Sequence, residues 1–306
     1  MKRLFWILII LYSVWGCHQN ATDPQEIQPP RQFTSLTEAQ SGVRFVNTVT
    51  ETPEFHHLLW ESVFYGGGAA IGDINNDNLP DIYFTGNQVN DALYLNLGGM
   101  RFEDISEQAM IQEPGTWSTG VTMADVNADG LLDVYVCRSW WDLDVNGMDQ
   151  RRNRLFINNG DLTFTERASE YGLDDAAYST QATFFDYDRD GDLDMYLMNA
   201  PSNNFRQKLR YMQDNRIPYL FSDKLYENTG ETFVDKTREA GIENYAFGLG
   251  LIASDINQDG WPDLYVACDY EQPDKLFINN RDGTFTDRSQ YLLKHTCYSS
   301  MGCDIA

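Results

Sequence analysis

The chain has 306 residues, of which 46 are acidic and 22 basic, giving a formal net charge of −24 at pH 7. A surface this negative repels phosphate, so nucleic acid and anionic lipid faces are excluded as main partners. Aromatic residues make up 13% of the chain, beside 23 glycines and 10 prolines. This composition favours short strands and tight turns over helices.

The first 16 residues have the pattern of a signal peptide for export. A short basic start precedes an apolar run from Leu4 to Val14, which is too short to span a bilayer. The run ends in a small residue and Cys17, which resembles the lipobox of bacterial lipoproteins, where that cysteine is acylated. We therefore expect an exported protein that is lipid-anchored to a bacterial membrane, most simply the outer one, with residues 17–32 as a flexible tether. Ordinary signal cleavage nearby, with Cys17 incidental, is the alternative.

An aspartate-rich nonapeptide recurs four times, beginning at Asp73, Asp125, Asp186 and Asp255, so the copies start 52, 61 and 69 residues apart. Each copy is followed by an apolar–aromatic–apolar triplet, then by an apolar element that ends in asparagine, then by an element that begins with phenylalanine. The extra length between copies falls near 140–152 and 199–223. A unit of about 50 residues with several short strands matches a β-propeller blade better than a two-helix repeat. Sustained helical periodicity is missing from the repeats, and only 206–215 could be a helix.

The two ends of the chain extend this repeat. Residues 33–43 look like one more copy of the third element, and propellers often close by lending an N-terminal strand to the last blade. Gly68, Gly120 and Gly250 each lie five residues before the first aspartate of a loop, and Gly302 repeats that position. We interpret the 306 residues as the N-terminal part of a longer product. A chain of four blades that does not close is the alternative.

The nonapeptides carry the chemistry. Oxygen-bearing side chains at positions 1, 3, 5 and 9, with a backbone carbonyl at position 7, can surround one hard cation. Position 6 must turn sharply, and it holds a glycine in three copies and Asn78 in the first. The predicted ligands are Asp73, Asn75, Asp77, Leu79, Asp81, Asp125, Asn127, Asp129, Leu131, Asp133, Asp186, Asp188, Asp190, Asp192, Asp194, Asp255, Asn257, Asp259, Trp261 and Asp263.

Electrostatics favours a bound ion in these loops. Carboxylates about 4 Å apart repel by on the order of 4 kcal/mol per pair at an effective dielectric constant near 20. Ligation by oxygen alone favours Ca²⁺ over Zn²⁺, and we expect about four Ca²⁺ ions. Asx-turns with solvated carboxylates are the alternative.

The loops and the strands after them resemble the FG-GAP/VCBS repeats of integrin-α-like propellers. The pattern from Phe33 onward is similar to the cartilage acidic protein (ASPIC/UnbV) family, and segments 65–73, 120–125 and 300–302 carry that likeness. The resemblance implies an all-β, seven-bladed propeller of a secreted or surface protein, of which this chain would hold about four and a half blades. Asn78 in place of glycine, and the missing later blades and C-terminal domain, depart from the family and leave ring closure open. The expected propeller covers 33–306, with repeats near 66–109, 118–172, 179–240 and 248–292 and a partial one at 300–306.

The expected function is a calcium-binding adhesion module for protein or glycan at the cell surface. Trp140 and Trp141 lie beside carboxylates in an insertion, which suits sugar stacking or a protein contact; an edge of the core is the alternative.

The sequence lacks a nucleophile elbow, a zinc-protease motif and a phosphate-binding glycine loop, so an enzyme is not expected. A polysaccharide-processing enzyme or accessory subunit on the same scaffold is the alternative. Cys297 and Cys303 could close a small loop, with buried free thiols as the alternative.

Overall fold

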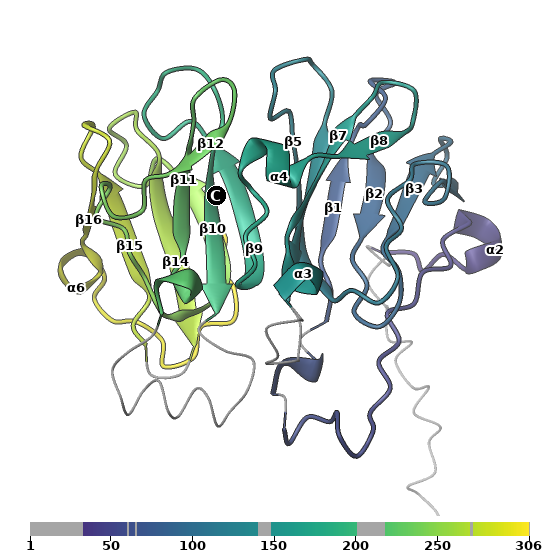
Figure 1. Ribbon diagram of the computed structural model, residues 1–306, viewed down its shortest axis with the longest axis horizontal. Helices are drawn as coiled ribbons and strands as arrows, with labels where there is room; N and C mark the ends of the chain where they lie inside the picture. The colour runs from purple at the N-terminus through teal and green to yellow at the C-terminus, as the bar shows by residue number, and fades with distance from the viewer. Residues whose placement is uncertain are drawn as a thin grey trace, which may run out of the picture. The chain divides into compact units, whose positions relative to one another are not determined.

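The computed structural model describes residues 33–59, 61–64, 66–139, 148–200, 218–269 and 272–305. Its strands form four antiparallel sheets, each of four strands in chain order (Figure 1). The first sheet contains β1 (Ala69–Gly72), β2 (Asp81–Phe84), β3 (Ala92–Asn96) and β4 (Phe102–Asp104), and the second contains β5 (Ser118–Ala124), β6 (Asp133–Arg138), β7 (Arg154–Asn158) and β8 (Phe164–Glu166). The third contains β9 (Tyr178–Phe185), β10 (Asp194–Ala200), β11 (Lys224–Asn228) and β12 (Phe233–Asp235), and the fourth contains β13 (Phe247–Ser254), β14 (Asp263–Asp269), β15 (Lys275–Asn279) and β16 (Phe285–Asp287). The predicted all-β fold with propeller-type blades is confirmed.

The triplets after the nonapeptides form the second strand of each blade. Every residue of β6 and β10 is buried, because each of these strands has a neighbouring sheet on both faces. A strand covered on both faces reads as a continuous apolar run, which is why the triplets do not alternate with polar residues.

Hydrophobic cores lie between neighbouring blades. Tyr83 and Leu93 of the first blade pack in one cluster with Val134 and Phe156 of the second. Equivalent clusters join the second blade to the third and the third to the fourth. Each blade is therefore stabilised by the next one, as sheet-on-sheet packing requires.

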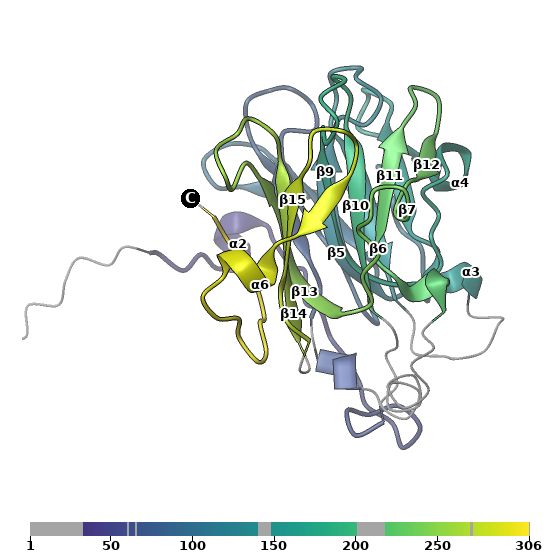
Figure 2. The same ribbon diagram turned by 90° about the vertical axis from the view of Figure 1, so that its left-hand side faces the viewer.

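The innermost strands β5, β9 and β13 lie side by side (Figure 2). Their backbones approach closely at the glycines that the sequence singled out: a Cβ on Gly120 would lie 2.5 Å from the carbonyl oxygen of Thr180, and one on Gly250 would lie 2.8 Å from Cα of Gly302. Between β5 and β9, the hydroxyl of Thr122 also donates to the carbonyl oxygen of Ala182 at 2.7 Å. These positions require glycine because no side chain fits between the strands.

A buried acid, or in the second blade an asparagine, lies at the start of the third strand and ties each blade to the next. Asp91 accepts hydrogen bonds from the hydroxyl of Tyr83 and the N–H of Gly86, and also from the hydroxyl of Ser118 in the following blade. Asp274 makes the same three contacts, the last of them with Ser300. Asp223 takes this place in the third blade, and Asn153 takes it in the second.

Helices are short, and two of the four α-helices among the described residues follow the fourth strand of a blade. The four are α2 (Glu38–Ser41), α3 (Met148–Arg151), α4 (Ala168–Tyr171) and α6 (Ser289–Leu292), with 3₁₀ turns at Glu61–Phe64 and Tyr219–Phe221. The prediction that only 206–215 could be helical is wrong for the repeats, because a single turn is too short to show a periodic pattern. Residues 206–215 themselves lie outside the described part of the chain. Among the described residues, none of the helices has the length and apolar character needed to cross a membrane.

The N-terminal copy of the third element is only partly realised. Residues 33–37 form no strand, but α2 and Gly42 follow as α4 and Gly172 do in the second blade. A Cβ on Gly42 would lie 2.2 Å from the carbonyl oxygen of Phe102, and one on Gly172 would lie 2.9 Å from that of Phe233. The helix and its glycine thus occupy the place of a preceding blade against β4, whereas the predicted strand is absent from the described residues.

Candidate metal centre

All four nonapeptides occupy the same place, the loop between the first and second strands of a blade. We call them loop 1 (residues 73–81), loop 2 (125–133), loop 3 (186–194) and loop 4 (255–263). Position 1 directly follows the inner strand, and position 9 is the first residue of β2, β6, β10 or β14. The repeat spacing therefore located each loop correctly.

Loop 2 illustrates the common geometry. The carboxylate of Asp125 accepts the N–H groups of Asp129 at 3.0 Å and Gly130 at 2.9 Å, which folds the chain around the acid. Gly130 has φ +87°, as predicted for position 6, and Ala128 at position 4 has φ +58°. Position 4 is left-handed in all four loops. This conformation could not be predicted from residue type, because position 4 holds a different residue in each loop: Asn76, Ala128, Arg189 and Gln258.

The position-9 aspartates anchor the loops to the sheet. Asp133 is fully buried and accepts the N–H of Val126 at 3.1 Å through one oxygen and that of Asn158 at 2.9 Å through the other. Asp81, Asp194 and Asp263 repeat both contacts. Burial raises the pKa of Asp133 to about 6. These hydrogen bonds tie each position-9 side chain, at the start of the second strand of its blade, to position 2 of its loop and to the end of the third strand.

Loop 3 differs from the others. One carboxylate oxygen from each of Asp186, Asp188 and Asp194 lies within 4.8 Å of the other two, and within the described residues these three make the one such group of possible metal ligands. Loops 1 and 2 have asparagine at position 3, whose amide donates at 3.0 Å to the aspartate at position 5, Asp77 or Asp129. Asp188 has no side-chain amide to donate, so the clustered carboxylates of loop 3 accept backbone N–H groups of Tyr187, Asp190 and Gly191 without the side-chain donor of loops 1 and 2.

Two oxygens in loop 3 are buried without a hydrogen-bond partner in the described chain, Oδ1 of Asp186 and Oδ1 of Asp192. Burial and the neighbouring carboxylates raise the pKa of Asp192 to about 6 and that of Asp194 to about 8. An unpaired buried carboxylate oxygen is costly, and a cation would relieve that cost. The donor set is oxygen only, which fits Ca²⁺. Asp192 was predicted to offer its carbonyl, and its side chain is a further candidate that the spacing did not indicate.

Loop 4 balances its charge differently. Asp259 pairs with Arg281 at 2.9 Å, and this contact is the main reason that its pKa is lowered. Trp261 lies under the guanidinium of Arg189 from loop 3, 5.5 Å from its ring centre. The predicted position-7 residues Leu79, Leu131, Asp192 and Trp261 each donate their N–H to the position-5 aspartate, and carbonyl ligation by them stays a prediction.

A cleft of about 360 Å³ lies between loops 2 and 3, lined by residues that include Asp125, Asn127, Asp192 and Asn228. The carboxylates of Asp125 and Asp192 give this lining negative charge, which favours cations over anions.

The remaining sequence predictions concern cysteines and the insertions. Cys137, Cys268, Cys297 and Cys303 are all free, with Cys137 and Cys268 buried and Cys297 exposed. Burial raises the pKa of Cys268 to about 12, so this thiol is inert. Cys17, Trp140 and Trp141 lie outside the described residues.

The loops and blades define a repeat family. The model of the FG-GAP-like repeat matches residues 73–136, 141–197 and 255–306, which together make up more than half of the chain. The protein therefore belongs to the FG-GAP-like repeat family.

Curated relatives point in the same direction. The chain is 25% identical to human cartilage acidic protein 1 over 222 residues, covering 71% of this chain and 30% of that protein. It is 28% identical to the Xenopus tropicalis protein of the same name over 212 residues, covering 66% and 28%. The chain thus spans less than a third of the length of these relatives.

Solved structures overlap only loosely. An Agrocybe aegerita lectin, described as recognising non-reducing terminal N-acetylglucosamine, gives a TM-score of 0.38 at 17% identity and covers 71% of this chain and 50% of its own. The Photorhabdus luminescens Tc holotoxin pore gives 0.23 at 12% identity, covering 72% and 12%. Neither overlap is close enough to carry an argument about function.

Proposed function

We propose that this protein is a calcium-stabilised propeller module that binds protein or glycan at a bacterial cell surface. The observation that carries the proposal is loop 3, where the oxygens of Asp186, Asp188 and Asp194 gather within 4.8 Å and a buried oxygen of Asp186 has no partner. When bound, Ca²⁺ would supply positive charge to this cluster. Asp186, Asp188, Asp190 and Asp194 would hold it, with Asp192 as a further ligand.

The role of the ion is structural in this proposal. Each loop joins the inner strand of a blade to its second strand, and the position-9 aspartate belongs to both the loop and the sheet. Fixing the loop therefore fixes the register at which the second strand starts. A protein with a formal charge of −24 also gains from each divalent ion through reduced self-repulsion.

Binding, rather than catalysis, is the activity that the family supports best. Repeat scaffolds present insertions as contact surfaces, and Trp140 and Trp141 are the proposed contact residues of this chain. Surface location rests on the N-terminal pattern, with Cys17 as the proposed lipid attachment site. Partners of either chemistry, protein or glycan, fit the aromatic and acidic character of the insertion.

Calorimetry tests the calcium proposal directly. The mature protein is dialysed against EGTA and then against excess Ca²⁺, and we expect a higher melting temperature with Ca²⁺ and elemental analysis that finds bound calcium. Equal melting temperatures with no bound calcium would show the proposal to be wrong. Two further experiments test the anchor and the contact surface. Labelling with palmitate, in cells that produce the native chain or its Cys17→Ala variant, tests the anchor. Binding of the native chain and of Trp140→Ala/Trp141→Ala to a glycan array tests the contact surface.

A further inference from the structure

One continuous path of hydrogen bonds joins the four loops. At its centre are the asparagines that end the third strand of each blade, Asn96, Asn158, Asn228 and Asn279. All four are at least nine-tenths buried. The sequence showed them as a repeated element, but neither the blade packing nor the predicted ligand set gave them a role.

The backbone N–H and the side-chain amide of each asparagine have different partners. The backbone N–H of Asn279 donates at 2.9 Å to Asp263, the position-9 acid of its own loop 4. Its side-chain amide donates at 2.8 Å to the carbonyl oxygen of Tyr187, which is position 2 of loop 3 in the preceding blade. Asn279 therefore contacts two loops in two blades.

The path continues through the position-2 residue. The peptide N–H of Tyr187 donates at 3.1 Å to Asp194, the position-9 acid of loop 3. Asp194 in turn accepts the N–H of Asn228 at 2.8 Å, and the side chain of Asn228 reaches the carbonyl oxygen of Val126 in loop 2 at 3.5 Å. Asn158 completes the path, bonding Asp133 in loop 2 and the carbonyl oxygen of Ile74 in loop 1.

Asn96 lacks the bridging contact. Its N–H donates to Asp81, but its side-chain amide donates to the carbonyl oxygen of Pro80 in the same loop. Like the other three, Asn96 bonds the position-9 aspartate of its own loop, but it does not join two loops. It is therefore a matched control.

We propose that Asn158, Asn228 and Asn279 are positioning residues that couple ion binding in one loop to ion binding in the next. The inference rests on the proposed function, since it concerns the same loops. An ion that fixes Asp194 also fixes the peptide of Tyr187 that bonds to it. The carbonyl of Tyr187 then holds Asn279, and Asn279 holds Asp263, so part of the ordering cost of loop 4 is met before its own ion arrives.

Loops 3 and 4 have a second contact that the test must separate from this path. The guanidinium of Arg189 in loop 3 lies over the ring of Trp261 in loop 4. If that contact carried the coupling, removing the side chain of Asn279 would leave it intact.

Nuclear magnetic resonance with ¹⁵N-glycine reports each loop separately. The N–H groups of Gly130, Gly191 and Gly260 donate to the position-1 aspartates of loops 2, 3 and 4. Ca²⁺ is titrated into the native mature chain and into Asp186→Asn/Asp188→Asn, in which loop 3 is disabled. We expect the affinity at Gly260 to fall by about two- to thirtyfold when loop 3 is disabled.

The comparison of intact and disabled loop 3 is then repeated in two further variants, Asn279→Ala and Asn96→Ala. In Asn279→Ala the loss of loop 3 should no longer change the affinity at Gly260, whereas in Asn96→Ala it should change that affinity as in the native chain. Should Asn279→Ala not fold, Asn279→Ser replaces it, since the shorter hydroxyl can still accept the N–H of Arg281 but cannot reach Tyr187.

The outcomes separate the two proposals. If Ca²⁺ shifts none of the three glycines, the proposed function fails and the coupling with it. If Ca²⁺ binds but disabling loop 3 leaves Gly260 unchanged, or if the effect persists in Asn279→Ala, the proposed function stands and the coupling through Asn279 is wrong.

Discussion

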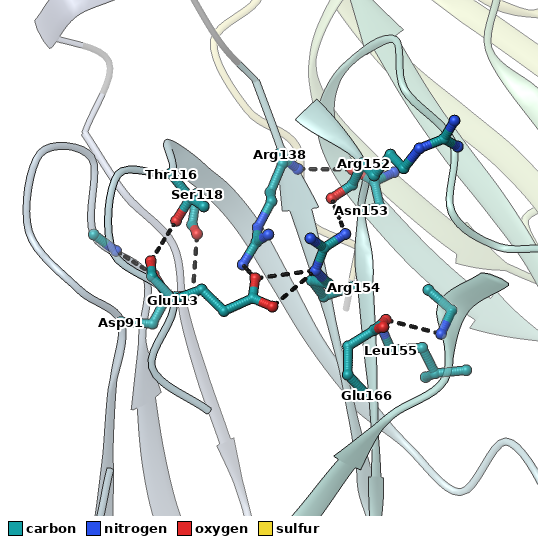
Figure 3. A network of polar contacts seen from close by, with 12 residues as sticks. Asp91, Glu113, Thr116, Ser118, Arg138, Arg152, Asn153, Arg154, Leu155 and Glu166 are labelled. Atoms are coloured by element: carbon teal, nitrogen blue, oxygen red, sulfur yellow. Dashed lines mark hydrogen bonds and ion pairs between the residues drawn. The ribbon is translucent and has the colours of Figure 1, made fainter. Parts of the chain in front are cut away.

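Glu113 forms an ion pair with Arg138, whose side chain is only 1% exposed (Figure 3). The same carboxylate also pairs with Arg154 at 3.0 Å, so one acid from the connection between β4 and β5 holds two arginines of β6 and β7. Two nitrogens of Arg138, Nε and Nη1, are buried without a partner among the described residues. The guanidinium therefore depends on Glu113 for its charge balance.

We expect Glu113→Ala to destabilise the protein by about 3 kcal/mol, because it leaves a buried charge unpaired. Arg138→Met should cost less, since it removes the buried charge itself and leaves Glu113 paired with Arg154. Urea unfolding with unchanged slope measures both effects. Glu170→Ala is the control, because its ion pair with Arg167 is exposed on both sides. The order is wrong if Arg138→Met proves the more damaging of the two.

The close approach of the inner strands gives a second prediction. A methyl group on Gly120 would meet the backbone of Thr180 and Gln181, which cannot rotate away as a side chain can. Gly120→Ala should therefore cost about 1–3 kcal/mol or more as an overpacked site. Gly302→Ala is the matched control, because a Cβ there meets nothing within 4 Å. Thermal unfolding of the two variants side by side decides the point, and equal melting temperatures would contradict the observed packing.

The repeat spacing predicted the blades and loops because duplicated units fold alike, so four weak local signals support one another. It could not distinguish loop 3, because asparagine and aspartate at position 3 both offer an oxygen. The difference appears only when the amide of Asn127 is seen to donate to Asp129 while Asp188 has no amide to donate. The buried acids Asp91, Asp223 and Asp274 were likewise missed, since their partners come from distant parts of the chain.

Asp223 predicts a pH dependence of stability that is opposite to that of an ordinary surface acid. Burial raises its pKa to about 6 from an ordinary value near 3.8. Between these two values the folded protein keeps a proton that the unfolded chain releases, so stability falls as the pH rises through this window and levels off above about pH 6. The shift of roughly two units corresponds to about 3 kcal/mol at most.

Carbon-13 NMR of the aspartate carboxyl groups, in saturating Ca²⁺ to keep the loops occupied, measures this directly. The resonance of Asp223 should titrate near pH 6. That of Asp161 should titrate below the ordinary range, because its hydrogen bonds to Thr163 lower its pKa. A midpoint for Asp223 below pH 4 would contradict the predicted effect of its burial.

Position 3 of the loops gives the sharpest prediction, because loops 2 and 3 can exchange their residues. Asp188→Asn gives loop 3 the amide donor of loop 2 and removes one of three clustered carboxylates. In EGTA we expect this variant to be more stable than the native chain by about 1–2 kcal/mol, a fraction of the repulsion of on the order of 4 kcal/mol for a close pair. In Ca²⁺ the gain should vanish or reverse, since the ion then loses a charged ligand.

Asn127→Asp is the reciprocal variant: it should destabilise the protein in EGTA and increase the stabilisation that Ca²⁺ provides. Calorimetry of the three proteins in both buffers tests the pair, and a variant order that is the same in EGTA and in Ca²⁺ would mean that position 3 does not tune ion binding.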